Sequence, residues 1–416
     1  MNPGNTISVE RWAGGTHARI DLGAYARNLA RLRTYSPAAM KLLAVVKGDA
    51  YGHGLAMCGL AAEAAGADWL GVARIQEALR LRNAGVSLPV LVLGPPNLAE
   101  IELAIAAQIT LAVGSYTAVD RLVALAEGGT VATVHLKIDT GMRRYGFTPG
   151  EIAAVALRLQ AAGVVIEGVF THFASADDLD PLPTTDAHAV FSAARAALRE
   201  VGIEPALAHA ANSAALITGF AGDTNMVRSG VATFGLSPSP EVPAPSDFEP
   251  IAEVWSVAAR SFTVRAMQGV TYNHTWIAQV DTPAAAVPVG YADGLPRGLQ
   301  NQGWFVVSGE VAPIIGRVCM DQTVAAVPVG VAEGTPVQVI GPAPAMTFAS
   351  SGAMVDSNNY EVASRMMARM PRVYVVNGDA IGWEHLLLGE ASYPALDELR
   401  TALHAVSMSP AAIPTG

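Results

Sequence analysis

Residues 1–240 repeat one pattern of apolar and polar positions. A short run of apolar, largely β-branched residues ends at a polar or small residue, and an Ala- and Leu-rich stretch with helical spacing follows most of the runs. Runs that are apolar throughout and alternate with helices are typical of parallel strands buried on both faces. The runs end at Lys47, Ala73, Gly94, Gly114, Asp139, His172, Asn212 and Val231, and the helical stretches include 54–67, 75–84, 151–162 and 185–201.

The number of these units favours one architecture. About eight strand–helix units in roughly 200–250 residues are typical of a (β/α)8 barrel. The alternative, an open doubly wound sheet, usually has fewer units and a glycine-rich first turn, which this sequence lacks. The sequence therefore predicts an α/β fold in which residues 12–243 form a TIM-like (β/α)8 barrel.

The pattern changes after residue 238. Residues 238–250 are rich in proline and acidic residues, which is typical of a connector. The apolar runs that follow are short, β-rich and separated by Gly, Pro and Asn, and helical spacing returns only at 359–369. We therefore expect a mostly-β domain over 244–390 and a C-terminal tail over 391–416, frayed from about residue 405.

Composition excludes two classes of protein. The 416 residues are 51% hydrophobic and 15% charged, and the mean hydropathy is +0.33. The long uncharged stretches contain Gly, Pro and polar residues, so none resembles the apolar run of about 20 residues that spans a membrane. The formal charge of −10 also argues against a nucleic acid, whose partners present a basic face. We expect neither a membrane nor a nucleic acid as partner.

The N-terminus and the cysteines indicate where the protein acts. The first residues do not combine a basic start with an apolar core, so we expect no secretory signal. Cys58 and Cys319 are too few for a disulfide framework, which favours a reducing compartment. The sequence predicts a cytoplasmic enzyme, and we assign no metal site.

Lys47 is the first candidate for chemistry. It follows five apolar residues at the end of the first predicted strand, and barrel enzymes carry their active sites at these carboxyl ends. A poorly solvated lysine has a lowered pKa, which makes its amine a nucleophile toward carbonyl groups. Alternatively, Lys47 simply extends to solvent at the rim, and its position alone does not decide between the two interpretations.

Three other residues suggest a phosphate site. Ser213 opens a short helix after the seventh strand, and Gly230 and Val231 follow the eighth, while Tyr51 lies just beyond Lys47 in a loop that its glycines let approach a ligand closely. Barrels often bind phosphate at the loops after strands seven and eight. Ser213 taken alone is explained equally well as a helix N-cap. Pyridoxal phosphate carries both an aldehyde for the lysine and a phosphate for these loops, so we predict it as the cofactor.

Seven motifs, in order along the chain, carry a family resemblance. Together they resemble alanine racemase from about residue 15 to about residue 385. That resemblance implies a pyridoxal-phosphate enzyme with an N-terminal barrel and a C-terminal β domain, which racemises a small amino acid, L-alanine to D-alanine, by a two-base mechanism. The motifs are KGDAYGHG, HLKIDTGMRRYGF, THFASAD, HAANSAA, NMVRSGVATFGL, VPVGYADG and PIIGRVCMDQ.

The resemblance also implies the catalytic roles. Lys47 matches the lysine that binds the cofactor and acts as one base, and Tyr272 matches the other base. His172 matches the histidine that assists this tyrosine, whose reference pKa of about 10 is high for a base. Arg228 matches the arginine facing the pyridine nitrogen. Because arginine stays protonated, that nitrogen stays unprotonated, which makes the cofactor a weaker electron sink and favours racemisation over transamination.

Further positions match groups around the substrate and the cofactor. Arg144 matches an arginine that contacts the cofactor ring oxygen and the substrate carboxylate, and the Met320 N–H and Asp321 match positions beside that carboxylate. Lys137 matches a lysine that is carbamylated in some members. The phosphate positions are Tyr51, Ser213, Gly230 and Val231, the entrance tyrosine is Tyr291, and His53, His135 and His209 are assigned structural roles.

Two departures from the family pattern affect the expected substrate. Many members carry a tyrosine just before the late Arg-x-Pro motif, where Ala368 stands here. Asn273 and His274 follow Tyr272, where a pair containing glycine is common. A missing phenol would leave a wider entrance, so we hypothesise that larger amino acids such as serine are accepted.

The family is dimeric, and each of its active sites combines the lysine of one subunit with the tyrosine of the other. We therefore expect a homodimer with shared active sites and an amino acid as the small-molecule partner. Three alternatives remain: a pyridoxal-phosphate lyase or decarboxylase, which Arg228 disfavours; a non-enzymatic cofactor carrier, which Tyr272 and Met320 disfavour; and a cofactor-free aldolase, which the phosphate positions disfavour.

Overall fold

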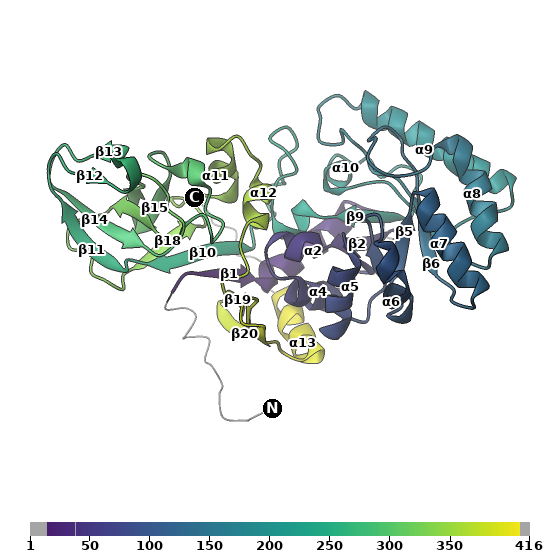
Figure 1. Cartoon of the computed structure of the whole chain (residues 1–416), viewed down its shortest axis with the longest axis horizontal. Helices are drawn as coiled ribbons and strands as arrows, with labels where there is room; N and C mark the ends of the chain where they lie inside the picture. The colour runs from purple at the N-terminus through teal and green to yellow at the C-terminus, as the bar shows by residue number, and fades with distance from the viewer. Residues whose placement is uncertain (1–14, 38, 408–416) are drawn as a thin grey trace. The chain divides into compact units, whose positions relative to one another are not determined.

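The computed structural model describes residues 15–37 and 39–407. The chain divides into two compact units, which are described separately (Figure 1). The barrel unit comprises residues 25–50 and 55–249. The β unit comprises, among the described residues, 15–24, 51–54 and 250–407.

The described part of the barrel unit contains a closed barrel of parallel strands, β2 to β9 in chain order, and β2 pairs with β9 to close it. Every one of the predicted apolar runs forms one of these strands, which confirms the predicted barrel. The strands are β2 (Lys41–Val45), β3 (Trp69–Val72), β4 (Val90–Val92), β5 (Thr110–Val113), β6 (Thr133–Lys137), β7 (Val165–Phe170), β8 (Leu207–His209) and β9 (Met226–Ser229).

Helices alternate with these strands and surround them; α4 is buried along nearly its whole length, whereas most of the others are amphipathic (Figure 1). Helix α8 shows why: Thr148 and Glu151 form a capping box at its start, and the buried residues between 152 and 159 recur every three or four positions. The helices are α2 (Leu22–Thr34), α4 (Leu55–Ala64), α5 (Ile75–Asn83), α6 (Ile101–Ala106), α7 (Tyr116–Glu127), α8 (Pro149–Ala161), α9 (Leu182–Glu200) and α10 (Ser213–Ile217), with the 3-10 helices η1 (Leu98–Glu100) and η2 (Val231–Phe234).

The β unit contains three sheets among the described residues, in the strand orders β16-β15-β18-β10-β1-β19-β20-β21, β11-β14-β17 and β12-β13. The strands are β1 (His17–Asp21), β10 (Ala252–Val257), β11 (Arg260–Val264), β12 (Gly269–Val270), β13 (Trp276–Ile277), β14 (Thr282–Val287), β15 (Trp304–Val307), β16 (Glu310–Pro313), β17 (Thr323–Ala326), β18 (Pro336–Ile340), β19 (Arg372–Val376), β20 (Asp379–His385) and β21 (Glu390–Ser392). Its helices are η3 (Tyr272–His274), η4 (Arg297–Leu299), α11 (Phe348–Met354), α12 (Asn359–Ser364) and α13 (Leu396–Ser407).

The division differs from the expected boundaries at both ends. Residues 17–21, expected in the barrel, form β1, which pairs with β10 on one side and with β19 on the other. Residues 396–407, expected in a tail, form α13, in which Leu399, Leu403 and Val406 are buried at helical spacing. The expected helix at 359–369 ends earlier, at Ser364. Residues 12–14 and 408–416 lie outside the described residues.

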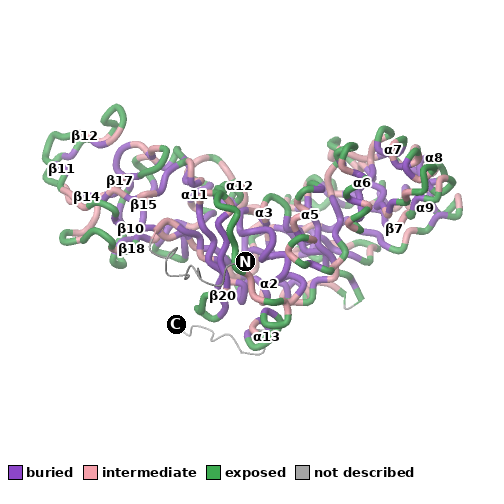
Figure 2. The backbone as a smooth tube through the Cα atoms, turned by 60° about the horizontal axis from the view of Figure 1, so that its bottom comes forward, coloured by how far each residue is buried: buried purple, intermediate pink, exposed green. Residues whose placement is uncertain are grey.

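The turn between β12 and β13 is exposed at residues 272–275, and this part of the chain is largely green in Figure 2. No helix among the described residues has both the length and the apolar character that crossing a membrane requires.

Candidate active site

Lys47 lies at the mouth of the barrel, directly after the buried residues that end β2. Its side chain reaches solvent there, but the surrounding barrel wall removes part of its hydration. This desolvation lowers the pKa of the Lys47 amine, and the charges of Arg144 and Arg228 lower it further against the opposing effect of Glu77. A lowered pKa makes the unprotonated amine of Lys47 easier to form, which is the direction that the sequence interpretation requires.

The chain turns sharply after Lys47. Gly48, Asp49 and Ala50 have φ of 64°, 54° and 55°, a left-handed conformation that costs roughly 1–2 kcal/mol for each residue other than glycine. Side chains of α5 and of the turn itself hold this conformation. Glu77 accepts a hydrogen bond from the Gly48 N–H at 2.6 Å, and Asp49 accepts one from the Arg80 guanidinium at 3.1 Å. The turn thereby fixes the position of the Lys47 backbone at the end of the strand.

Arg228 is almost completely buried on β9, with 4% of its surface exposed. Its guanidinium donates to the carbonyl oxygens of Thr171 and Ala210, both at 2.8 Å, and to Nδ1 of His209 at 2.9 Å and of His172 at 3.1 Å. All four partners are neutral. Burial lowers the pKa of Arg228 to about 9, which leaves the group cationic at neutral pH.

The surroundings of His172 show that basic side chains gather at the barrel mouth. Burial and the charges of Arg228, Lys137, Arg144 and Lys47 hold its pKa well below the usual value. Because Arg228 can only donate, Nδ1 of His172 is an acceptor, and the ring proton is therefore on Nε2. Four basic side chains around one neutral histidine, two of them arginines, make this mouth a site for an anionic ligand.

Lys137 on β6 belongs to the same group of cations. Burial lowers its pKa to about 7, and the charge of Arg228 contributes to this shift. Its ammonium donates to the Ile138 carbonyl oxygen at 2.7 Å and lies 5.4 Å from the centre of the Phe170 ring. The neutral amine of Lys137 is consequently accessible near neutral pH.

Ser213 does not cap its own helix. Asn212 caps α10, accepting a hydrogen bond from the Ala215 N–H at 3.0 Å. The Ser213 hydroxyl instead accepts from the Gly230 N–H at 2.9 Å, so it joins the start of α10 to the start of η2. Ser213, Gly230 and Val231 therefore lie together as the phosphate interpretation requires, and β9, which leads to Gly230, is the neighbour of the strand that leads to Lys47.

The remaining predicted residues belong to the β unit. Tyr272 is 69% exposed on η3, next to the β12–β13 hairpin, and Tyr291 and Met320 are also exposed. The backbone of the 291–292 segment donates to the carbonyl oxygens of Cys319 and Met320, at 3.1 and 3.0 Å, so Tyr291, Met320 and Asp321 lie close together. Tyr51 is also part of this unit, and burial raises the pKa of its phenol.

Arg369 holds this part of the β unit together. It bridges Asp293, with contacts of 2.7 and 2.9 Å, and Asp321, at 2.7 Å. The carboxylate of Asp321, which we expected beside the substrate, is thus engaged by an arginine adjacent to Ala368. Neither Arg369 nor Asp293 was predicted as a site residue, although Asp293 lies in the VGYADG motif of the family resemblance and Arg369 begins the Arg-x-Pro motif next to Ala368.

Three residues around Tyr272 have a left-handed backbone: Thr271 with φ of 57°, Asn273 with 60° and His274 with 47°. Glycine adopts this conformation without cost, which explains why a glycine-containing pair is common after the tyrosine. Asparagine and histidine are among the residues that tolerate it best. The departure at 273–274 is therefore compatible with the same backbone path.

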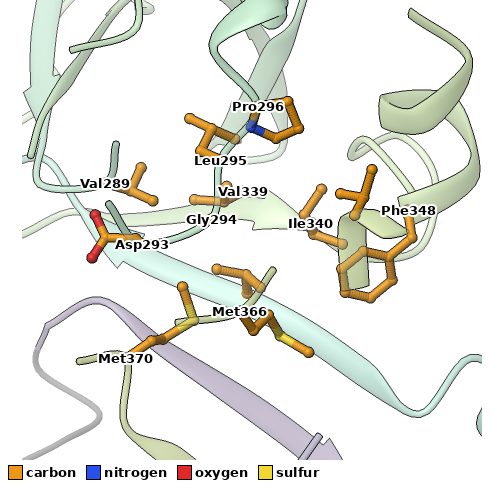
Figure 3. Close-up of a pocket in the computed structure, with 12 residues that line it drawn as sticks. Val289, Asp293, Gly294, Leu295, Pro296, Val339, Ile340, Phe348, Met366 and Met370 are labelled. Atoms are coloured by element: carbon orange, nitrogen blue, oxygen red, sulfur yellow. The ribbon is translucent and has the colours of Figure 1, made fainter. Parts of the chain in front are cut away.

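The β unit also has a small cavity lined by apolar side chains such as Val289, Met366 and Met370, with Asp293 at its edge (Figure 3). Its volume of about 20 Å³ is close to that of one water molecule, so it is too small for an amino acid. The cavity is not a substrate site.

Comparisons with known proteins agree with this geometry. The sequence matches the family description "Alanine racemase, N-terminal domain" over residues 20–238 and "Alanine racemase, C-terminal domain" over residues 252–374. It is 37% identical over 366 residues to an alanine racemase of Desulfovibrio desulfuricans, covering 86% of this chain and 97% of the relative. It is 40% identical over 376 residues to one of Beutenbergia cavernae, covering 87% and 98%.

A solved structure gives the same result. The crystal structure of alanine racemase from Bacillus anthracis with bound L-Ala-P superimposes with a TM-score of 0.86 at 33% identity, covering 90% of this chain and 98% of that chain. A barrel with a desolvated lysine among cations, a β domain and these similarities define an amino-acid racemase, which is an isomerase. The chain belongs to the alanine racemase family, and its reaction is the racemisation of alanine.

Proposed function

We propose that this chain racemises alanine with pyridoxal phosphate, that Lys47 and Tyr272 are its two bases, and that two copies form a dimer with shared active sites in the cytoplasm. The observation that carries the proposal is the desolvated Lys47 amine among the cations of the barrel mouth. The cofactor, when bound, supplies an electron sink that makes the Cα proton of the amino acid acidic.

The donor set of the barrel unit fits this cofactor. The amine of Lys47 would bind its aldehyde, and the Ser213 hydroxyl and the Val231 N–H would hold its phosphate together with the Gly230 N–H, which would exchange Ser213 Oγ for a phosphate oxygen. The positive charges of Arg144 and Arg228 would offset the negative charges of the phosphate and of the substrate carboxylate. Because Arg228 donates but cannot accept, it would leave the pyridine nitrogen unprotonated, which favours return of the proton to Cα.

The two bases would act from opposite faces of the substrate, since racemisation requires removal of a proton on one face and delivery on the other. Lys47 meets the requirement for a base through its lowered pKa. Tyr272 lies on the exposed end of the β unit, which supports its use by a second subunit. The Nε2–H of the neutral His172 would donate to this phenol and stabilise its ionised form.

Incubation of the purified holoenzyme with L-alanine in deuterated water tests the proposed function. We expect D-alanine to form, with deuterium at Cα of both enantiomers. A set of other L-amino acids serves as the comparison. Exchange without inversion, or release of a keto acid as the main product, would contradict the racemase assignment of these residues.

We expect Lys137 to be carbamylated at neutral and higher pH. With a pKa of about 7, its amine is increasingly neutral as the pH rises through 7, and a neutral amine adds CO2 to form an anionic carbamate. This anion would offset the neighbouring charges of Arg144 and Arg228. The measurement is 13C NMR of protein equilibrated with labelled bicarbonate, with Lys137→Ala as the control; no carbamate signal between pH 7 and 9 would refute the expectation.

We expect L-serine to be a second substrate, because Ala368 replaces the tyrosine of many family members. Its kcat/KM should lie within about 100-fold of that for L-alanine, since an added hydroxyl is rejected only weakly where no polar group must be matched. Ala368→Tyr should raise the preference for alanine, and Ala391→Tyr, at an exposed site on β21, should not. An alanine preference well above 100-fold that Ala368→Tyr leaves unchanged would refute the hypothesis.

A further inference from the structure

A continuous line of polar side chains runs through the interior of the barrel unit, away from the mouth. It begins at Arg228 on β9, whose guanidinium lies 2.9 Å from Nδ1 of His209 on β8. Nε2 of His209 lies 2.8 Å from Nδ1 of His135 on β6. Nε2 of His135 lies 3.4 Å from Oε2 of Glu167 on β7, an electrostatic contact that lacks the geometry of a hydrogen bond. Both histidines are completely buried, and Glu167 is partly exposed.

The donors and acceptors of this line have only one consistent direction. Arg228 can only donate, so Nδ1 of His209 must accept, and the proton of its neutral ring is on Nε2. That proton is donated to Nδ1 of His135, which places the proton of His135 on its own Nε2, facing the Glu167 carboxylate. Burial, as the first cause, lowers the pKa of both histidines, so both rings are neutral at pH 7.

Packing holds the two rings in this orientation. The His209 ring stacks on Phe170, with ring centres 4.8 Å apart and an interplanar angle of 4°. The His135 ring lies 5.4 Å from the Trp69 ring. A Cβ atom at Gly168 would lie 2.5 Å from Nδ1 of His135, so the ring position depends on this glycine. The rings cannot easily rotate to exchange their nitrogen atoms.

The line also links two opposite charges. Arg228 is buried among neutral partners, which is costly for a cation. Glu167 is the acidic group at the other end of the line, and its carboxylate favours the Nε2–H form of His135, which in turn favours the Nε2–H form of His209. Each neutral imidazole passes on the polarisation of its neighbour, as hydrogen-bond chains in a low dielectric do.

We propose that Glu167 is a positioning residue for racemisation: through His135 and His209 it presents an acceptor nitrogen to Arg228 and so holds the Arg228 guanidinium in place. The inference rests on the proposed role of Arg228 toward the cofactor. It assigns the two histidines, which we had interpreted as structural, to the support of that arginine. The alternative is that Glu167 only stabilises the barrel, for example by accepting a hydrogen bond from the Thr110 hydroxyl at 3.5 Å.

The first test is 15N NMR of the histidine rings in the wild-type holoenzyme. We expect His135 and His209 both to carry their proton on Nε2 between pH 6 and 8. A proton on Nδ1 of either ring would overturn the proposal without any variant having to fold. This readout does not depend on activity, so it also separates the proposal from the proposed function.

The second test is Glu167→Gln, which keeps the size of the side chain and removes its charge, with Glu127→Gln on the exposed end of α7 as the matched control. We expect Glu167→Gln to mix the ring tautomers and to lower kcat for L-alanine about 10-fold, because the negative charge that favours the Nε2–H form of His135 is removed. KM should change little, and pyruvate released per racemisation should rise. Unchanged tautomers and pyruvate, with a lower melting temperature alone, would assign Glu167 to stability only.

The outcomes distinguish a failure of the proposed function from a failure of the proposed role of Glu167. If the wild type does not racemise alanine, the proposed function fails whatever the ring tautomers are. If the wild type is active and Glu167→Gln matches Glu127→Gln in kcat, pyruvate release and tautomers, only the role of Glu167 fails.

Discussion

Lys47→Ala lowers kcat for L-alanine by about 1000-fold or more, because one residue supplies both the attachment of the cofactor and one of the bases. The visible absorbance band of the covalently bound cofactor is lost at the same time. Lys41→Ala is the matched control, since Lys41 begins the strand whose far end leads to Lys47 and its side chain is exposed. Steady-state kinetics and an absorbance spectrum of the dialysed protein measure both effects.

The opposite result for Lys47→Ala would contradict both proposed roles of this lysine. If Lys47→Ala retained the absorbance band and more than a tenth of the wild-type kcat, the amine at this position would be neither the anchor nor a base. The left-handed turn after Lys47 would then need another explanation, because its strain is stored next to a residue with no function.

Tyr272→Phe should lower kcat by about 100- to 10,000-fold, the range that removal of a general acid or base usually produces. The expected cause is loss of a single hydroxyl, so the cofactor spectrum should remain. Tyr116→Phe, another exposed tyrosine, serves as the control. Kinetics in both directions should show the same loss, since each base acts in both directions.

Mixing the two inactive proteins tests whether a site is shared. A heterodimer of a Lys47→Ala subunit and a Tyr272→Phe subunit contains one site with both defects and one site with neither, so activity should return. The mixture is refolded together, and the heterodimer is isolated by two affinity tags before assay. Verified heterodimers that remain inactive would show that each subunit uses its own lysine and tyrosine.

The barrel could be predicted from sequence because the composition of each strand shows that the strand is buried. A strand buried on both faces is apolar at every position, and this signal is local. Strand β1 lacks it: the residues at 17–21 include His, Arg and Asp, and the partners β10 and β19 are more than two hundred residues away in the chain. Only a long-range pairing assigns β1 to the β unit.

Helix α13 is a different case, because its signals were present. Asp397 and Glu398 lie in its first turn, and its buried residues follow helical spacing. Its position near the end of the chain led to the expectation of a tail. Burial of Leu399 and Leu403 stabilises it in spite of that position.

For the site, sequence identified residue types but not their partners. Asn and Ser are equally good N-caps, so 212–213 did not show which residue caps α10 and which is left for Gly230. The hydrogen-bond partners of Arg228 come from β8 and from the segments that follow β7 and β8, and the nitrogen atom that each histidine presents depends on which donor or acceptor lies opposite it. The link from Arg228 to Glu167 therefore required coordinates.

The placement of β1 has a consequence for how the gene can be divided. The strand at the centre of the largest sheet is encoded before the barrel, and both of its neighbours are encoded after it. The barrel is thus an insertion within the β unit rather than a module placed ahead of it. Cutting the coding sequence at the proline-rich connector would remove a middle strand and leave two bare edges, whereas the barrel's own strands would all stay on one fragment.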